Sequence, residues 1–232
     1  MPARATVTPL RRRTQEERSA STRARVLDAA LACLATLGYA STTTTVVAER
    51  AGVSRGAQLH HFRTRSALIG AAVQHLFANL TLAYQDAFAR LGPEADRVAA
   101  AIDLLWEIFQ DPRLAAVLEL YVAARTDAEL RAALTPVAAR HQANIAALAR
   151  CYFPDAAAAS PRFEAVLDLV LDTLQGMAVR RLLDADAERV ARTLALVKEV
   201  ASAVITPRPL PRRPEHRPAR RRPAHTLRKE TA

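Results

Sequence analysis

Apolar residues recur along most of this chain at intervals of three and four positions, the spacing of one face of an α-helix. Residues 15–37 carry one such stripe, formed by Val26, Leu27, Ala30, Leu31, Leu34 and Leu37. Gly38 follows and is expected to end this helix, because glycine accepts backbone conformations that stop a helix. A second stripe predicts one long helix over residues 65–90, closed by Gly92 and Pro93; it is formed by Leu68, Ile69, Ala72, Val73, Leu76, Leu80 and Tyr84.

The chain beyond the long helix has the same periodicity, interrupted by Pro and Asp. It predicts five more helices, over residues 95–109, 113–125, 127–152, 161–183 and 185–205. The last two have the widest apolar stripes: Phe163, Val166, Leu167, Val170, Leu171, Leu174, Met177 and Ala178, then Val190, Leu194, Val197, Ala201 and Val204. Such stripes are satisfied either within one subunit or against a second copy of the chain.

Between the first two stripes, residues 43–62 predict two short helices joined by a tight turn. Thr43 is expected to cap the first helix, because its hydroxyl can accept a backbone N–H. Gly52 is expected to end it, since only glycine takes a left-handed helix end without steric cost. Ser54 is then the cap of the second helix, which runs to Phe62. Its surface is expected to carry side chains that reach base edges and phosphates: Arg55, Gln58, His60 and His61.

Composition supports an all-α protein, since Ala, Leu, Arg and Val dominate and half of the 232 residues are hydrophobic. The formal net charge of +10 lies at the ends of the chain. Residues 1–25 hold seven Arg and two Glu, and residues 206–232 hold nine Arg or Lys, two Glu and six Pro. Both ends are expected to be disordered, and they either follow DNA phosphates or only solubilise the protein. Cys33 and Cys151 are expected to be buried, reduced thiols, with a disulfide or metal site as the alternative.

The stretch GVSRGAQLHHF, with two Thr about ten residues before it and Arg65 three residues after Phe62, resembles the helix-turn-helix of TetR/AcrR-type transcriptional regulators. This resemblance implies a three-helix DNA-binding head over residues 20–80, with the motif at 43–62. A basic arm (1–19) precedes it. A helical ligand-binding and dimerisation domain (81–206) and a Pro/Arg-rich tail (207–232) follow. It also implies a homodimer through the last two helices, residues 161–205, bound to a palindromic operator in double-stranded DNA.

The candidate DNA contacts combine side-chain chemistry with this resemblance. Gln58 can bond adenine in a bidentate manner, and Arg55 can bond guanine or a phosphate. Leu59 stands where the family often has a Tyr that contacts phosphate, so this contact is either lost or replaced by packing on a thymine methyl. His60 and His61 point about 100° apart on a helix and are expected to make polar DNA contacts, not to bind metal. The remaining candidates are Thr43, Thr45, Ser54 and, by resemblance as a phosphate contact, Arg65. Thr43 either holds a phosphate or only caps its helix, and Thr45 faces the same way.

A second candidate site is a mostly apolar effector pocket in the domain that follows the head. Aromatic and polar residues interrupt its apolar stretches, and such residues can line a pocket and orient a small molecule. Any one polar member could equally be solvent-exposed. The candidates are Trp106, Phe109, Tyr121, Arg125, His141, Asp172 and Gln175.

These patterns predict a ligand-responsive repressor that is cytoplasmic, has no cofactor and does not associate with a membrane. A signal peptide and a run of eighteen apolar residues are absent from the sequence. The alternative is a DNA-compacting protein that binds through its basic ends without regard to sequence. An enzyme is disfavoured, because the sequence has no phosphate-binding Gly loop, catalytic triad or metal-ligand cluster.

Overall fold

The computed structural model describes residues 14–92 and 96–205, and these residues form ten helices and no strand. The all-α prediction is confirmed. The predictions made for the arm before Thr14, for Pro93 and for the tail after Ile205 lie outside the described residues.

The head consists of α1 (Gln15–Ser41), α2 (Thr44–Ala51) and α3 (Arg55–His61). Thr14 and Glu17 form a reciprocal capping box at the start of α1. Gly38 breaks α1 as predicted, with φ 74° and ψ 174°, and one further turn leads to Ser41. Leu37, just before this break, is 47% exposed, so its predicted place in the buried stripe is wrong.

The turn chemistry of the head is as predicted. The Thr43 hydroxyl accepts the Val46 N–H at 3.2 Å and caps α2. Gly52 ends α2 in the left-handed conformation, with φ 62° and ψ 41°. The Ser54 hydroxyl accepts the Ala57 N–H at 3.1 Å and caps α3. Each signal is local in sequence, which is why it could be predicted.

The long helix α4 (Arg65–Ala89) is the centre of the protein and packs against α1, α5 and α7. Its length and apolar composition would also suit a membrane-spanning helix, and no other helix of the described residues has this property. Buried core helices have the same composition, and 44% of its most apolar stretch is inside the fold. Its apolar side chains therefore form the core of this structure.

The second domain contains the other six described helices. They are α5 (Arg97–Phe109), α6 (Pro112–Ala123), α7 (Ala128–Tyr152), α8 (Pro154–Ala159), α9 (Phe163–Arg181) and α10 (Ala187–Ile205). The helix α8 was not predicted, and α9 begins at Phe163, not at Pro161. The short segment has one buried residue, Ala156, so it has no apolar stripe that could reveal it.

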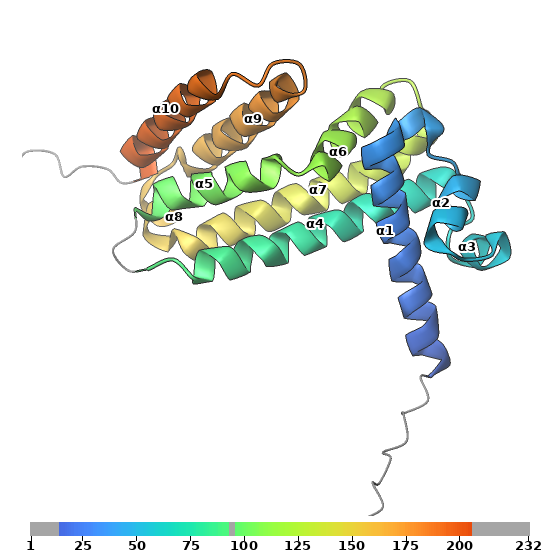
Figure 1. Ribbon diagram of the computed structural model, residues 1–232. Coiled ribbons are helices and arrows are strands. Elements are labelled where there is room, and N and C mark those ends of the chain that lie inside the picture. Colours follow the sequence, from blue (N-terminus) through green and yellow to red (C-terminus); the bar gives the residue numbers. More distant parts are fainter. Residues whose placement is uncertain (1–13, 93–95, 206–232) are drawn as a thin grey trace, which may run out of the picture.

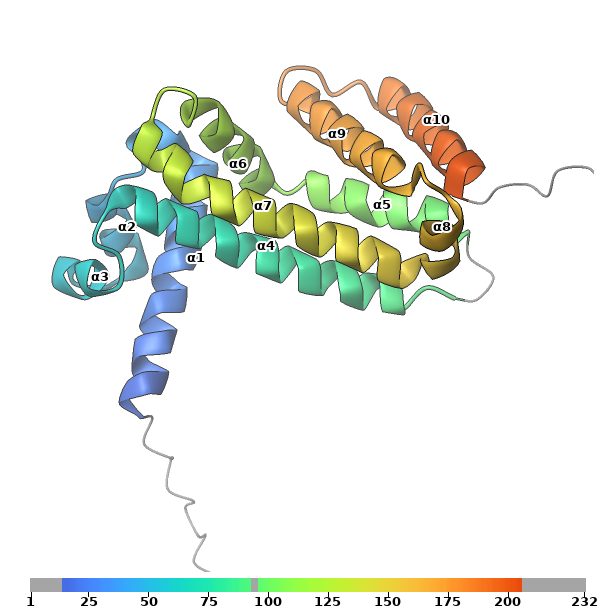
Figure 2. The same ribbon diagram turned by 180° about the vertical axis from the view of Figure 1, so that it is seen from behind.

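Figures 1 and 2 show the head at one end of the molecule, with α4, α5 and α7 running side by side away from it. The pair α9 and α10 covers α5. One buried cluster is continuous from the head into α6 and α7, and a second lies between α5, α9 and α10. Cys33 is fully buried in the first cluster, but Cys151 is exposed, which corrects the prediction of two buried thiols; neither forms a disulfide.

Candidate nucleic-acid interface and ligand cavity

The helix α3 lies at the outer end of the head, where it packs on α1 and α2 (Figures 1 and 2). Its outward side carries Arg55, Leu59 and His60, all exposed. Thr43 and Thr45 of the neighbouring turn and helix are exposed as well. With Ser54, which is exposed too, the structure places six of the nine predicted DNA contacts on accessible parts of the head.

Gln58 does not lie on this surface, which corrects the prediction that it reads a base. Its side chain is 0% exposed, and neither its Oε1 nor its Nε2 has a hydrogen-bond partner among the described residues. The helical period explains the placement: Gln58 and Phe62 are four residues apart, so they share the inward side, and Phe62 is buried too. Leu59, one position on, is 40% exposed. Side-chain polarity alone therefore selected Gln58 as the surface residue, whereas the exposed residue is its neighbour Leu59.

Two arginines of the head, one of them the predicted phosphate contact Arg65, form hydrogen bonds within the protein itself. Arg65 donates from Nε to the Thr42 carbonyl at 2.8 Å and from Nη2 to the Tyr39 carbonyl, and its guanidinium stacks on the Tyr39 ring. These contacts leave Nη1 for the predicted phosphate contact. Arg25 donates from Nη2 to the carbonyls of Ala51 and Gly52, at 2.6 and 3.0 Å. It therefore caps the C-terminal end of α2.

The other predicted contacts have mixed environments. Ser54 is exposed, and its hydroxyl oxygen already accepts the Ala57 N–H, so its own O–H remains to donate to a phosphate. His61 is half-buried, with its ring edge-on to His60 at 5.4 Å between centroids. Burial, His60 and the Arg23 guanidinium lower the pKa of His61. A neutral His61 can donate or accept one hydrogen bond but adds no charge for DNA.

Replacing Arg55 by Ala should weaken binding to a preferred DNA site by roughly 1–3 kcal/mol, the range for losing one bidentate base contact. The measurement is fluorescence anisotropy with a duplex selected by the protein from a random pool. Arg90→Ala, which removes the same charge from the exposed far end of α4, is the control and should change affinity little. An equal loss on random DNA would show that Arg55 contacts a phosphate instead.

A cavity of about 490 Å³, partly open to solvent, lies between α4, α5, α6, α7, α9 and α10. Its lining is predominantly apolar and includes seven aromatic rings, those of Phe77, Tyr84, Phe109, Tyr121, Tyr152, Phe153 and Phe163. Five of the seven predicted ligand residues line it: Phe109, Tyr121, His141, Asp172 and Gln175. This size and lining are typical of small-molecule sites in proteins.

Trp106 and Arg125 do not line the cavity, which corrects their predicted role. Trp106 lies on the side of α5 that packs into the core with α9 and α10, and the Arg181 guanidinium lies 5.9 Å from its ring centroid. Arg125 is exposed in the turn after α6. Conversely, Tyr84 was assigned only to the apolar stripe of α4 and Phe77 was given no role, yet both line the cavity. In the sequence, an apolar residue that packs in the core cannot be distinguished from one that lines a cavity.

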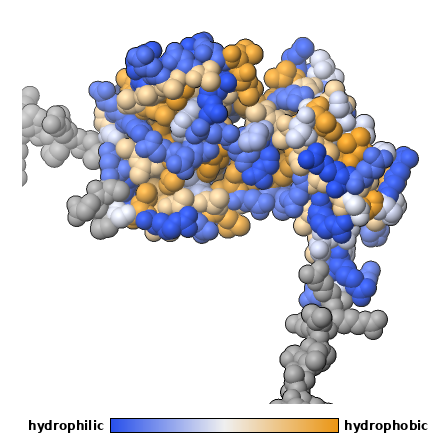
Figure 3. Space-filling model, in the orientation of Figure 1, coloured by the Kyte–Doolittle hydropathy of each residue, from blue (hydrophilic) through white to orange (hydrophobic). Residues whose placement is uncertain are grey.

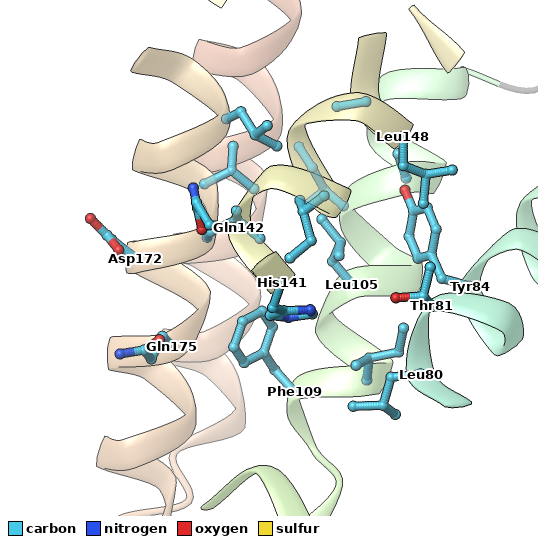
Figure 4. Close-up of a pocket in the computed structure, with 18 of the residues that line it drawn as sticks. Leu80, Thr81, Tyr84, Leu105, Phe109, His141, Gln142, Leu148, Asp172 and Gln175 are labelled. Atoms are coloured by element: carbon cyan, nitrogen blue, oxygen red, sulfur yellow. The ribbon is translucent and has the colours of Figure 1, made fainter. Parts of the chain in front are cut away.

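His141 brings a buried polar atom to the cavity wall. Its ring stacks on Phe77, with 3.7 Å between centroids and 7° between planes. Its Nδ1 is buried and has no hydrogen-bond partner among the described residues. Burial lowers the pKa of His141 to about 4, so the imidazole is neutral at pH 7. Figure 4 shows the ring reaching into the cavity from α7, with Thr81 and Tyr84 on the opposite wall.

Polar contacts that the sequence did not reveal join the head to the second domain. The Tyr39 N–H donates to Glu119 Oε1 of α6 at 2.8 Å, and the Tyr39 hydroxyl donates to Asp127 Oδ2 at 2.8 Å. Asp127 also caps α7 by accepting the Leu130 N–H. The bonds from Leu130 and Tyr39 lower the pKa of Asp127. Tyr39 therefore connects the turn before α2 to the ends of two helices of the second domain.

A helix-turn-helix head with an exposed α3, joined through one long helix to a helical domain that contains a cavity, defines the class of DNA-binding transcriptional regulators with two domains. Residues 26–72 match the family described as bacterial regulatory proteins, tetR family. The chain belongs to the TetR family.

Its relatives extend this similarity over both domains. The chain is 33% identical over 191 residues to the HTH-type transcriptional regulator CymR of Pseudomonas putida, which covers 82% of this chain and 94% of CymR. It is 30% identical over 169 residues to an uncharacterized HTH-type regulator, Rv2912c, of Mycobacterium tuberculosis, covering 73% and 87%. The solved structure of the multidrug binding protein EbrR with ethidium is similar at a TM-score of 0.57 and 27% identity, covering 79% of this chain and 98% of EbrR.

Proposed function

We propose that this protein is a ligand-responsive repressor that binds a palindromic operator as a homodimer and leaves it when a small molecule enters the cavity. The observation that carries this proposal is the course of α4. Its first residue, Arg65, braces the turn before α2, and three turns further on Phe77 begins a series of α4 residues that line the cavity. A ligand that prefers one tilt of α4 would therefore change the position of the head.

A second connection supports the same coupling. The helix α6 lines the cavity with Leu114, Val117, Leu118 and Tyr121. The same helix carries Glu119, which accepts the Tyr39 N–H of the head. A shift of α6 on ligand binding would therefore act directly on the turn between α1 and α2.

The homodimer is proposed from apolar side chains that a single chain leaves exposed. On α9, α10 and the turn between them these are Leu169, Val179, Leu182, Leu183, Leu196 and Val200. Figure 3 shows part of this hydrophobic surface, in orange, over the end where α9 and α10 are connected. Two copies related by a two-fold axis would bury it as a four-helix bundle. The same axis would place two copies of α3 on the two halves of a palindrome.

Small-molecule binding is supported by the solved complexes of EbrR, a multidrug binding protein, with ethidium and with proflavin. The proposed function needs no cofactor and no catalytic step. We place the protein in the cytoplasm, since its proposed partner is chromosomal DNA.

The proposal predicts that operator and ligand weaken each other's binding by the same factor, about 5- to 150-fold, because coupling between two sites is reciprocal. The ligand would be the tightest binder from a thermal-shift screen of small aromatic compounds that do not intercalate into DNA. Calorimetry gives its affinity with and without the selected duplex, and anisotropy gives the DNA affinity with and without ligand. Equal affinities would mean that the second domain serves dimerisation alone.

A DNA footprint tests the alternative function. A footprint spread over random DNA, not confined to one palindrome, would indicate DNA compaction instead.

A further inference from the structure

We propose that the cavity selects an aromatic molecule without net negative charge, anchored by one hydrogen bond to His141. This inference rests on the proposed function, because it names the ligand class of the same cavity. Three features of the cavity carry it: the charges of its wall, the unpaired nitrogen of His141 and the aromatic rings around it.

The described part of the cavity wall offers no positive charge to an anion. Among the described residues neither Lys nor Arg lines it, and the one carboxylate there belongs to Asp172. Figure 4 shows the polar ends of Asp172 and Gln175 pointing out from α9, away from His141. The Gln142 amide is also engaged, since it donates to Asp168 at 2.9 Å. A carboxylate or phosphate taken into this apolar space would lose its hydration without gaining a counter-ion, which is strongly unfavourable.

His141 instead offers a neutral hydrogen-bonding group. Its Nδ1 is buried and has no partner among the described residues, and the stack on Phe77 fixes the plane of the ring. A neutral imidazole has one nitrogen that donates and one that accepts, so whichever ring nitrogen a ligand hydroxyl reaches can pair with it in either tautomer. Leaving such a group unpaired costs about 1–3 kcal/mol, and a ligand that pairs with it recovers part of this free energy.

The aromatic rings indicate the shape of the ligand. Tyr84 and Tyr152 line the cavity, and Phe88, outside it, stacks on both, with 4.0 Å between the Phe88 and Tyr152 centroids. Phe109 and Tyr121 line it from α5 and α6. Flat aromatic groups pack well against faces and edges of such rings. A fused two-ring compound with a single polar substituent is a suitable probe for a cavity of about 490 Å³.

The test uses the full chain without DNA and three probes on one scaffold: naphthalene, 2-naphthol and 2-naphthoate. Calorimetry at pH 7 should rank 2-naphthol first, roughly 3- to 10-fold tighter than naphthalene, the range expected for one neutral hydrogen bond. 2-Naphthoate should bind most weakly. His141→Phe keeps a ring to stack on Phe77 but removes both nitrogens, so it should abolish the preference for 2-naphthol over naphthalene. His141→Asn, which places an amide near the position of Nδ1, should retain part of that preference.

Three results would overturn the proposal. Tightest binding of 2-naphthoate, with uptake of a proton, would show that His141 becomes a cation for an acidic ligand. A preference for 2-naphthol that survives in His141→Phe would place the anchor elsewhere. Failure of all three probes to bind would reject an aromatic ligand. The three probes are compared on the unaltered chain, so this comparison stands even if a variant fails to fold. If 2-naphthol binds as expected but leaves DNA affinity unchanged, the ligand class stands and the repressor mechanism fails.

Discussion

Replacing Leu169 and Leu196 together by Glu is expected to convert the protein to monomers and to lower its affinity for a palindromic site by about 100-fold or more. Leu169 on α9 is 52% exposed and Leu196 on α10 is 59% exposed in the single chain. In the proposed dimer both would be buried, and a two-fold axis would bring the new carboxylates of both chains to the interface, where unpaired charges are unfavourable. Each head would then bind its half-site alone, without the effective concentration that the linked second head supplies.

Analytical ultracentrifugation measures the assembly state, and anisotropy with the selected palindrome measures the affinity. The matched control is Leu82→Glu, because Leu82 on α4 is also exposed, at 60%, but lies away from α9 and α10. The control should remain a dimer with unchanged DNA affinity. A dimer that persists in the double variant would reject α9 and α10 as the interface.

Replacing Gln58 by Met should raise the free energy of unfolding by about 1–3 kcal/mol, the usual cost of a buried polar group that lacks a partner. Met is unbranched and close to Gln in volume, so the packing around α3 should change little. Chemical denaturation should show a higher midpoint with an unchanged dependence on denaturant. Gln74→Met, at an exposed position of α4, is the control and should alter stability by less than about 0.5 kcal/mol.

The variant Gln58→Met also tests whether α3 has the same orientation in the DNA-bound protein as in the free protein. With Gln58 directed inward, Gln58→Met should leave the affinity for the selected palindrome unchanged. Selective loss of affinity for that site, with no gain in stability, would mean that Gln58 turns outward to a base in the bound state. The buried placement would then describe only the free protein.

The sequence predicted the helix ends of the head because their causes are local. Thr43, Gly52 and Ser54 act on backbone groups within a few residues, so their roles follow from residue type and spacing. The roles of Arg25 and Arg65 depend instead on carbonyls 23 to 27 residues away along the chain. Sequence reasoning could not identify these bonds, since nothing near either arginine in the sequence indicated the partner carbonyls.

The candidate effector residues illustrate a second limit. The criterion was an aromatic or polar residue within an apolar stretch. It correctly selected Phe109, Tyr121 and His141, which line one cavity because the helices that carry them face each other. Trp106 satisfied the same criterion but faces the α9–α10 core. Which side of α5 faces the cavity is decided by how neighbouring helices pack, and periodicity cannot distinguish two buried sides of one helix.

The ties between the head and the second domain have an evolutionary consequence. Tyr39, Glu119 and Asp127 form these hydrogen bonds, and none of the three lines the cavity. Substitutions in the cavity wall can therefore change which molecule is bound without altering the contacts that connect α6 and α7 to the head. In this architecture a lineage can acquire a new chemical signal while keeping its operator, so that the sensor and the genes it controls diverge independently.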